Sequence, residues 1–459
     1  MFKPIGFRFQ WAFLIAGDVV VAALATCAAF AARRPMPPPV HSFAAAFFFV
    51  ALWIAAIFLF DLYRIDRPLP SEGQLVFFVI GVASVVGIGA AVGGVVVPGL
   101  DLGRRFDVAY LGVGGFVLLL FRIWTENAFS RRIKLGVMIG GKDGYASLLA
   151  DEVARRRHLG YRLIGFFEHS PEATALSNGR VWNGATLYQA ASLNALDSVP
   201  TLRNLVLGDD ARAQFAAEDV LHAKRRGICV VDYDSFYERL TGRLNVSALG
   251  NSRRATAPQL GWPRWRARLK RIVDLVAASL LGVVAMPVAL VTALAIKLDS
   301  PGPVLYTQDR VGADGRVFRV YKFRSMRLSD ENDADSMWTD ANDSRVTRVG
   351  RLIRKRHIDE LPQLLNVLKG EMSLVGPRPQ HPAWVEALTK QLPQYVLRHQ
   401  VKPGITGWAQ VCRGYGLTVQ DHTEIACYDL YYIKNWSLAF DLQIILQTAK
   451  VVLLARGTH

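Results

Sequence analysis

Four long apolar runs open the chain, and they constrain its fold more than any other feature. They lie at about 11–32, 42–60, 75–97 and 107–124. A helix needs about 20 mostly apolar residues to cross a bilayer, which the first three runs satisfy and the fourth approaches. The first run is too long for a secretory signal peptide and lacks a clear cleavage site, so we interpret it as a permanent span. The sequence therefore predicts a four-helix transmembrane bundle over residues 1–130.

Basic residues at both ends of this region predict its orientation. Lys3 and Arg8 precede the first run, and a basic segment at 131–134 follows the fourth. Because loops rich in lysine and arginine stay in the cytoplasm, both ends are expected there. The pair Arg33 and Arg34, which would lie outside, runs against this rule.

The charge balance narrows the expected partners. The net charge is +16, from 54 lysines and arginines against 38 acidic residues. Such an excess is typical of proteins that bind nucleic acid, anionic lipid or phosphorylated substrates. Here it accompanies membrane segments, which favours the last two, and no nucleic acid is expected. The four cysteines (27, 229, 412 and 427) form no CxxC pair and are interpreted as reduced, structural thiols.

A fifth apolar run, at 272–296, differs from the others because it contains Asp274 and Pro287. Basic residues flank it on both sides, within 264–271 and 310–327. Both flanks are therefore predicted to stay cytoplasmic, and a proline kink would provide the apex of a segment that enters the bilayer and returns. We expect a re-entrant membrane helix at about 268–298. An ordinary fifth span with a tolerated proline is the alternative.

Residues 131–255 are predicted to form a Rossmann-like α/β domain. Four short apolar runs, KLGVMIGG, YRLIGFFE, LRNLVLG and GICVVDY, alternate with helical stretches. This alternation is typical of a parallel sheet. The dinucleotide fingerprint GxGxxG would need glycine at Ile139, so a structural or regulatory domain is favoured over a cofactor-binding one, as in a nucleotide-sugar dehydratase. Residues 251–261 are interpreted as a linker.

Two adjacent acids, Asp359 and Glu360, precede Pro362 in a field of arginines. Proline is tolerated in the first turn of a helix and disfavours the α conformation at Leu361 before it, so the helix is predicted to begin at about the acids. The positive end of its dipole would attract phosphate and stabilise a charged adduct on an aspartate. In the alternative interpretation, the acids only cap the helix and pair with arginines.

Three cations are candidate ligands of that phosphate. Arg378 lies between Pro377 and Pro379, which stiffen the backbone and suit its guanidinium to bidentate phosphate recognition. Lys322 and Arg324 are the other two, with a basic patch at the membrane surface as the alternative.

Six segments in series resemble a known family. They are KRIVDLVAASLL, IKLDSPGPVLYTQDRVG, FRVYKFRSM, IDELPQLLNVLKGEMSLVGPRP, KPGITGWAQ and YDLYYIKNWSL, in order from about Leu269 to the C-terminus. This series, with Pro287, resembles the bacterial sugar transferases, the monotopic phosphoglycosyl transferases. The resemblance implies a mostly helical monotopic catalytic domain over residues 256–459 with a re-entrant helix. The upstream architecture resembles that of the long family members.

The resemblance implies transfer of hexose 1-phosphate from a UDP-sugar to undecaprenyl phosphate, which releases UMP and forms undecaprenyl-diphosphate-sugar. This would be the first step of exopolysaccharide or capsule repeat-unit assembly, on the cytoplasmic side of the bacterial inner membrane. Glucose 1-phosphate is the expected group, and galactose 1-phosphate is the alternative. Membrane lipid is an expected contact, and a homodimer is compatible with the large accessory domain. The competing interpretation, a non-catalytic membrane scaffold of an export complex, has no need of the paired acids.

The same resemblance assigns residue roles. Asp359 is implied as the nucleophile, which forms a covalent phosphosugar intermediate and gives ping-pong kinetics. Glu360 would accept a proton from the polyprenyl phosphate, and Mg²⁺ held partly by Asp359 would offset diphosphate charge. Arg354 matches the family's arginine upstream of the acids and is expected to contact substrate phosphate or the nucleophile. It is the last of a row of four arginines spaced by three residues, which are Arg345, Arg348, Arg351 and Arg354. Arg345 and Arg348 are expected to be solvated or near lipid headgroups.

Two positions depart from the family pattern. His357 stands where a small hydroxyl residue is common, and Cys412 stands where asparagine usually follows TGWAQV. The loop after Cys412 is therefore a place where sugar selectivity can differ. Four aromatic residues near the C-terminus are expected to anchor the domain at the bilayer interface rather than to border a sugar: Trp408, Tyr431, Tyr432 and Trp436.

Overall fold

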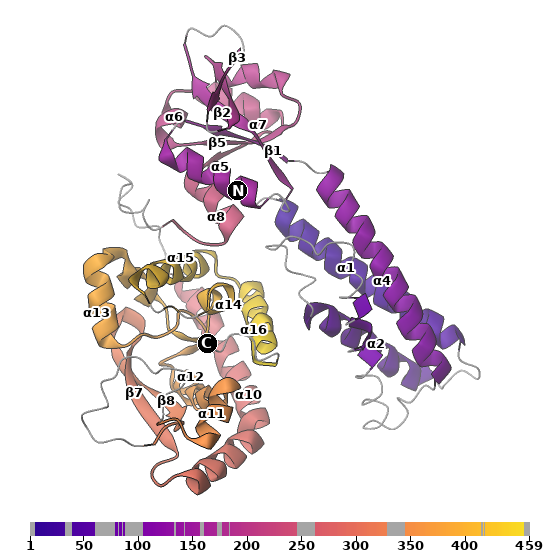
Figure 1. Ribbon diagram of the computed structural model, residues 1–459, viewed down its shortest axis with the longest axis vertical. Helices are drawn as coiled ribbons and strands as arrows, with labels where there is room; N and C mark the ends of the chain where they lie inside the picture. The colour runs from indigo at the N-terminus through magenta and orange to yellow at the C-terminus, as the bar shows by residue number, and fades with distance from the viewer. Residues whose placement is uncertain are drawn as a thin grey trace. The chain divides into compact units, whose positions relative to one another are not determined.

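The computed structural model divides into two compact units, residues 1–236 and 237–459. Figure 1 shows its elements. The structure describes residues 5–32, 39–59, parts of 79–87, 104–132, 135–156 except 142, 160–245 except 172–176 and 183, and 262–453 except 328–344, 415 and 417. Most of the predicted third span and the predicted linker at 251–261 lie outside the described residues.

The first unit begins with three long helices, α1 (Ile5–Ala32), α2 (Pro39–Leu59) and α4 (Arg104–Arg132). α1 packs against α2 and α4 around a core that contains Trp53 and Tyr110. Arg122 of α4 donates a 2.5 Å hydrogen bond to Asp18 of α1, and both side chains are buried. A buried ion pair inside an apolar bundle favours one register of the two helices, because breaking a buried pair is costly.

By length and composition, two described helices could cross a membrane, with windows at Leu14–Ala31 and Arg264–Asp299. The apolar stretches of α2 and α4, Phe47–Ile57 and Tyr110–Thr125, are shorter. The four-helix transmembrane bundle therefore remains a prediction.

The first unit also contains a six-stranded sheet in the order β3-β4-β2-β1-β5-β6. All neighbours are parallel except β3 and β4, which form an antiparallel hairpin. The predicted parallel α/β sheet is confirmed, and the hairpin is an addition that the sequence pattern did not indicate. The elements are β1 (Leu135–Gly140), α5 (Gly144–Arg155), β2 (Tyr161–His169), β3 (Ser177–Trp182), β4 (Ala185–Ala190), η2 (Leu193–Ser198), β5 (Leu202–Leu207), α6 (Asp209–Ala213), α7 (Ala217–Arg225), β6 (Cys229–Asp232) and α8 (Tyr233–Thr241).

Tyr233 fills the place where a sheet of this kind usually binds its ligand. That place is the crevice at the carboxyl ends of the strands where the strand order reverses, here between β1 and β5. The Tyr233 hydroxyl donates a hydrogen bond to the carbonyl of Gly140 at the end of β1. Its ring also lies against Gly208 after β5, where a Cβ atom would come within 3.0 Å of it. The structural or regulatory role of this domain remains a prediction.

The second unit is mostly helical, with two small sheets. The hairpin of β7 and β8 is antiparallel, and β9 pairs with β10 in parallel. The elements are α10 (Arg264–Asp299), β7 (Leu305–Val311), η3 (Ala313–Gly315), β8 (Val317–Phe323), α11 (Arg348–Lys355), η5 (Ile358–Glu360), α12 (Gln363–Lys369), β9 (Ser373–Val375), α13 (Pro382–Gln391), η6 (Pro393–Gln400), β10 (Gly404–Thr406), α14 (Trp408–Cys412), α15 (Val419–Asn435) and α16 (Leu438–Leu453).

Asp441 of α16 joins three elements in the core of this unit. Its carboxylate accepts hydrogen bonds from Lys270 of α10 at 2.8 Å, from the Tyr432 hydroxyl at 2.8 Å and from the Trp436 indole at 3.0 Å. Tyr432 and Trp436 are buried. The prediction that these two aromatic residues anchor at the bilayer interface is therefore wrong, because their polar atoms serve the buried carboxylate.

α10 is assigned as one continuous helix of 36 residues that includes Pro287. Near its start, Asp274 accepts a 3.2 Å hydrogen bond from the backbone of Leu374 in β9. Near its end, Ile296 belongs to a core cluster that Leu361 packs against. Between these contacts Ala278 and Thr292 are buried, but most of the other side chains are exposed, and Val284 is 76% exposed. Pro287 does not divide the helix into two elements, because a proline removes one backbone hydrogen bond and the turns on either side can continue.

Candidate active site

The paired acids lie in a tight turn between two helices. α11 ends at Lys355, His357 adopts a left-handed backbone conformation with φ of 55°, and the 3₁₀ turn η5 then carries Asp359 and Glu360. The backbone N–H of Glu360 donates to the carbonyl of His357 at 3.2 Å. A left-handed conformation is uncommon for a histidine and costs about 1–3 kcal/mol. His357 therefore lies at the turn between the end of α11 and η5.

The helix after the acids begins later than predicted. Pro362 is its N-cap, and α12 starts at Gln363. Leu361 has φ of −53° and ψ of −38°, which is helical, so the prediction that it leaves the α region is wrong. Its N–H donates to Ile358 at 3.1 Å and its carbonyl accepts from Leu364 at 3.1 Å. These two hydrogen bonds and the packing of its side chain outweigh the local preference that a following proline imposes.

Glu360 is 9% exposed and is held between two cations. Arg378 donates to its Oε1 at 2.7 Å and to its Oε2 at 3.4 Å, and Lys322 of β8 lies 3.4 Å from Oε1. Burial opposes ionisation of this carboxyl group, but the charges of Arg378 and Lys322 outweigh it and hold the pKa of Glu360 well below its ordinary value. Glu360 is therefore a carboxylate at neutral pH and a weak base while both cations stay in place.

Asp359 differs from its neighbour. Within the described residues its carboxylate accepts no side-chain or backbone hydrogen bond and forms no ion pair, although the side chain is half-buried. Burial and the adjacent charge of Glu360 raise the pKa of Asp359, while Lys322 opposes the shift. A more basic carboxylate without a partner is better suited to attack phosphorus than one clamped by two cations.

A buried ion pair fixes the backbone that carries Arg378. Arg398 donates to the Arg378 carbonyl at 2.8 Å and pairs with Asp429 of α15 at 2.7 Å. Arg398 and Asp429 are 1% and 2% exposed. Pro377 is buried, and its carbonyl accepts from Gly404 at 3.0 Å. The backbone on which Arg378 stands is thus held at two carbonyls, those of Pro377 and Arg378. The sequence did not indicate this support, because the partners are far apart in the chain.

Arg310 is a further cation that the sequence analysis did not single out. It lies in β7, next to the last residue of the strand, and its guanidinium donates to the carbonyl of Pro379 at 3.4 Å. Burial, and then the charge of Arg378, lower its pKa to about 10. Arg310 and Arg378 line the same cavity, and two guanidinium groups at one site favour an anion beside them.

Asn366 of α12 is fully buried and positions Lys322. Its side chain donates to the Arg319 carbonyl at 2.7 Å and accepts from the Tyr321 N–H at 3.1 Å, which fixes strand β8 against α12. Its amide also donates to Glu371 at 2.7 Å. Lys322 follows Tyr321 directly in β8. By fixing this strand against α12, the Asn366 amide therefore helps to position the Lys322 ammonium group near Glu360.

Arg324 has a different place from the one predicted. Its buried guanidinium donates to the carbonyls of Ser300 and Pro301, both at 2.7 Å, and to the Ser300 hydroxyl at 2.9 Å. These groups follow the last turn of α10, where helical carbonyls lack intrahelical partners. Arg324 therefore closes the end of α10, and the prediction that it contacts phosphate is replaced by this structural role.

The positions of Arg354 and the other arginines of the row agree only in part with the single helix face that was expected. Arg348, Arg351 and Arg354 lie on α11, whereas Arg345 precedes the helix. Arg348 and Arg351 are exposed, and Arg354 is half-buried. The structure thus brings Lys322, Arg378 and Glu360 together, and it leaves the expected contact of Arg354 with phosphate as a prediction.

The described residues contain no group of three side chains suited to hold a metal ion. Mg²⁺ does not require one, because it is usually bound by one or two carboxylates together with water and substrate phosphates. The Asp359 carboxylate, which has no hydrogen-bond partner among the described residues, fits such a site once a diphosphate supplies the remaining ligands.

A cavity of about 170 Å³ opens beside Arg378. Arg310, Arg378, Trp384, Gln410 and His422 are among the residues that line it. These side chains come from segments between 310 and 422 that are separate in sequence, so the cavity is a product of the tertiary fold.

Comparison with known proteins matches residues 265–455 to the family described as bacterial sugar transferase. A relative from Escherichia coli (strain K12), named UDP-glucose:undecaprenyl-phosphate glucose-1-phosphate transferase, is 34% identical over 331 residues, 71% of this chain and 68% of the relative. An undecaprenyl-phosphate glucose phosphotransferase from Komagataeibacter xylinus is 38% identical over 72% of this chain and 61% of its own length.

A third relative, from Aeromonas hydrophila, is named UDP-N-acetylgalactosamine-undecaprenyl-phosphate N-acetylgalactosaminephosphotransferase. It is 45% identical over 222 residues, which are 48% of this chain and 52% of the relative. The relatives therefore differ in the sugar that their names give.

Proposed function

This chain belongs to the bacterial sugar transferase family, and on that premise we propose that it transfers a hexose 1-phosphate from a UDP-sugar to undecaprenyl phosphate, with release of UMP. One observation carries the proposal. Asp359 presents a carboxylate without a partner among the described residues, next to Glu360 and its cations Lys322 and Arg378. A nucleophile beside fixed positive charge is what transfer of a phosphoryl group requires.

The proposed reaction has two steps. An oxygen of Asp359 attacks the sugar-bearing phosphorus of the donor, the bond from that phosphorus to the bridging oxygen breaks, and UMP leaves with the electron pair. A phosphate oxygen of undecaprenyl phosphate then attacks the same phosphorus, which releases Asp359 and forms undecaprenyl-diphosphate-sugar. Arg378 and Lys322 bind the donor phosphates and offset the charge that develops. Bound Mg²⁺ would supply further charge neutralisation, held by Asp359.

Glu360 has two roles in this proposal. In the free enzyme it orients Arg378 and Lys322 through the ion pairs described above. When substrate phosphate draws these cations away, Glu360 loses the charges that depress its pKa and becomes a stronger base. It can then accept a proton from the incoming polyprenyl phosphate, which is the role expected from the sequence.

We place the catalytic unit on the cytoplasmic face of the bacterial inner membrane, with α10 dipping into the bilayer. Both end regions of α10 pack within the same unit, through Asp274 and Ile296, and the exposed side chains between them are apolar. Cysteines introduced at Arg268 and Arg316, in a background without native cysteines, should both react with a membrane-impermeant reagent from the cytoplasmic side. Labelling from opposite sides would show an ordinary span instead.

Glucose 1-phosphate is the proposed group, because two of the relatives are named for glucose, and galactose 1-phosphate is the alternative. Purified protein in nanodiscs with undecaprenyl phosphate and Mg²⁺ should release UMP from one member of a UDP-sugar panel. Asp359→Asn should abolish this release. A variant that turns over at the wild-type rate would remove Asp359 from the proposed mechanism.

A further inference from the structure

Two residues that line the cavity beside Arg378, Gln410 and His422, each carry a buried polar atom without a hydrogen-bond partner among the described residues. Oε1 of Gln410 and Nδ1 of His422 make no hydrogen bond to any described residue. His422 is only 4% exposed. A buried polar atom left unpaired costs about 1–3 kcal/mol, and such atoms are few in native proteins. Two such side chains in the lining of one cavity point to a polar ligand there.

The size of the cavity limits the ligand to about one ring. Its volume is about 170 Å³, whereas an apolar cavity of roughly 150 Å³ is known to hold one benzene molecule. A hexose is a single ring that carries several hydroxyl groups, each a donor and an acceptor. A nucleoside has two rings and would leave one of them outside. The volume and the unpaired atoms therefore both favour the hexose.

The lining also fits the two kinds of surface that a sugar presents. Trp384 supplies an aromatic ring, and the centroid of this ring lies 5.2 Å from that of the His422 ring. Arg378 contributes to the cavity and also binds Glu360, so the cavity begins where the donor phosphates are proposed to lie. If a donor phosphate binds Arg378 as proposed, the sugar attached to that phosphate would lie at the entrance of this cavity.

We propose that this cavity receives the hexose of the UDP-sugar donor and that Gln410 and His422 determine which hexose is accepted. The inference rests on the proposed transferase function and adds the place where the sugar is recognised. The Gln410 oxygen accepts a hydrogen bond from one sugar hydroxyl, and the His422 nitrogen pairs with a second. Hydroxyl groups that are axial in one hexose and equatorial in another would meet these atoms differently.

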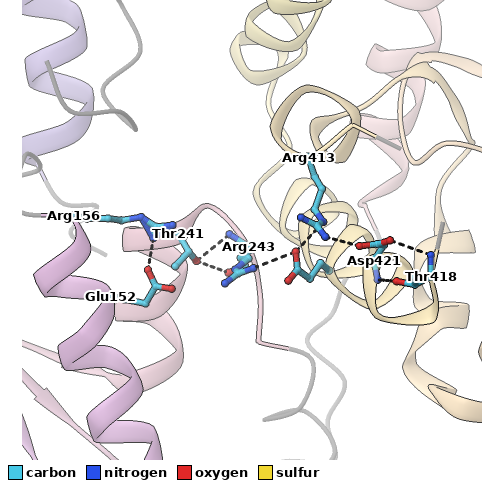
Figure 2. A network of polar contacts seen from close by, with 8 residues as sticks. Glu152, Arg156, Thr241, Arg243, Arg413, Thr418 and Asp421 are labelled. Carbon is cyan, nitrogen blue, oxygen red and sulfur yellow. Dashed lines mark hydrogen bonds and ion pairs between the residues drawn. The ribbon is translucent and has the colours of Figure 1, made fainter. Parts of the chain in front are cut away.

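The wall of the cavity is held in place by a network of charges. Gly414 and Gly416 form part of the wall, in the turn between α14 and α15. Figure 2 shows Arg413 beside Asp421, to which it donates a 2.5 Å hydrogen bond, and Thr418, whose hydroxyl accepts from the Asp421 N–H at 3.1 Å. Contacts of this kind hold the described residues on either side of the turn and reduce the entropy cost of ordering the cavity on binding.

The network also reaches the segment that enters the second unit. Arg413 pairs with Glu424 at 2.9 Å, and Arg243 lies 3.9 Å from the same carboxylate. The Trp408 indole at the start of α14 donates to the Gly242 carbonyl at 2.8 Å. Described residues on both sides of the turn that follows Cys412 are thus tied to residues 242–243.

The test compares UMP release by the full-length protein in nanodiscs across UDP-glucose, UDP-galactose, UDP-N-acetylglucosamine and UDP-N-acetylgalactosamine. Gln410→Leu should lower kcat/KM for the preferred sugar about tenfold and lower it less for the others, because one specific hydrogen bond is lost. Inhibition by the product UMP should stay unchanged, since UMP carries no hexose. His422→Asn is the second variant, and it should change the order of preference in the same assay.

Gln447→Leu is the matched control. Gln447 also has a buried Oε1 without a partner among the described residues, but it lies on α16 and does not line the cavity. It should keep the wild-type sugar order, and thermal unfolding of all variants shows whether they are folded. Weaker UMP inhibition with an equal loss for every sugar would assign the cavity to uridine and overturn the inference.

The remaining outcomes separate the two proposals. Active, folded Gln410→Leu and His422→Asn variants with the wild-type sugar order would overturn the sugar site alone. A wild-type protein that releases no UMP from any of the four donors would overturn the proposed function and the inference with it.

Discussion

The carboxylate of Glu360 accepts a 2.7 Å hydrogen bond from the guanidinium of Arg378. The carbonyl of Arg378 in turn accepts from Arg398, which is paired with Asp429 on α15. A chain of charge-assisted contacts therefore runs from a buried helix to the paired acids. Each side chain in this chain of contacts is held in one orientation, because the groups that it binds are themselves held by other contacts. The position of the Arg378 guanidinium thus depends on the buried pair of Arg398 and Asp429.

Asp429→Asn should destabilise the second unit and lower its activity. The change leaves the buried Arg398 charge without its counterion, and breaking one partner of a buried pair costs about 3–5 kcal/mol. Thermal unfolding and UMP release would measure both effects. Glu386→Gln is the matched control, because Glu386 pairs with Lys390 at 2.8 Å on an exposed helix face, where a pair contributes about 0–1 kcal/mol. Equal losses in the two variants would contradict the structural role of Asp429.

Glu360→Gln should separate the two proposed steps. The amide keeps the shape of the side chain but is a far weaker proton acceptor, so turnover with undecaprenyl phosphate should fall about 10²–10⁴-fold. With donor alone, the variant should still release about one equivalent of UMP, because Asp359 is intact. Quench-flow measurement of UMP would record this burst. Loss of the burst together with turnover would show that Glu360 acts chiefly by positioning Arg378.

Arg324→Met should lower stability without weakening donor binding. The substitution removes hydrogen bonds to Ser300 and Pro301 at the end of α10, and each buried carbonyl left unpaired costs about 1–3 kcal/mol. The midpoint of thermal unfolding should fall, while the KM for the UDP-sugar in the folded protein should not change. Arg351→Met, at an exposed position on α11, should leave both unchanged. A raised KM with normal stability would restore the phosphate role first expected for Arg324.

His399 should make the second unit less stable in mild acid. Burial and the neighbouring Arg398 lower the pKa of His399 from 6.5 to about 4. Between these values the unfolded chain binds a proton that the folded protein does not, so stability falls as pH falls through this window and is fully present above it. In thermal unfolding at about pH 5 and pH 7.5, His399→Gln should show a smaller difference than the wild type. An equal difference would mean that other groups set the acid sensitivity.

The sequence by itself determined much of the architecture and the reaction class. Alternating apolar runs predicted the parallel sheet, because strand and helix periodicities are local properties of the chain. The segment around Asp359 and Glu360 was predicted to hold the site, because a helix start among arginines suits a phosphate ligand and the segment belongs to the motif series. The motif series pointed to the family that the comparisons confirm.

Only the tertiary structure decided which charged side chains serve the site. Lys322 and Arg324 are two residues apart and looked equivalent in sequence, yet one binds Glu360 and the other closes α10. The helical conformation of Leu361 was likewise decided by packing against a distant core. The physical reason is that a residue's conformational preference depends on its neighbours in sequence, whereas the burial and pairing of its charge depend on segments that only folding brings together.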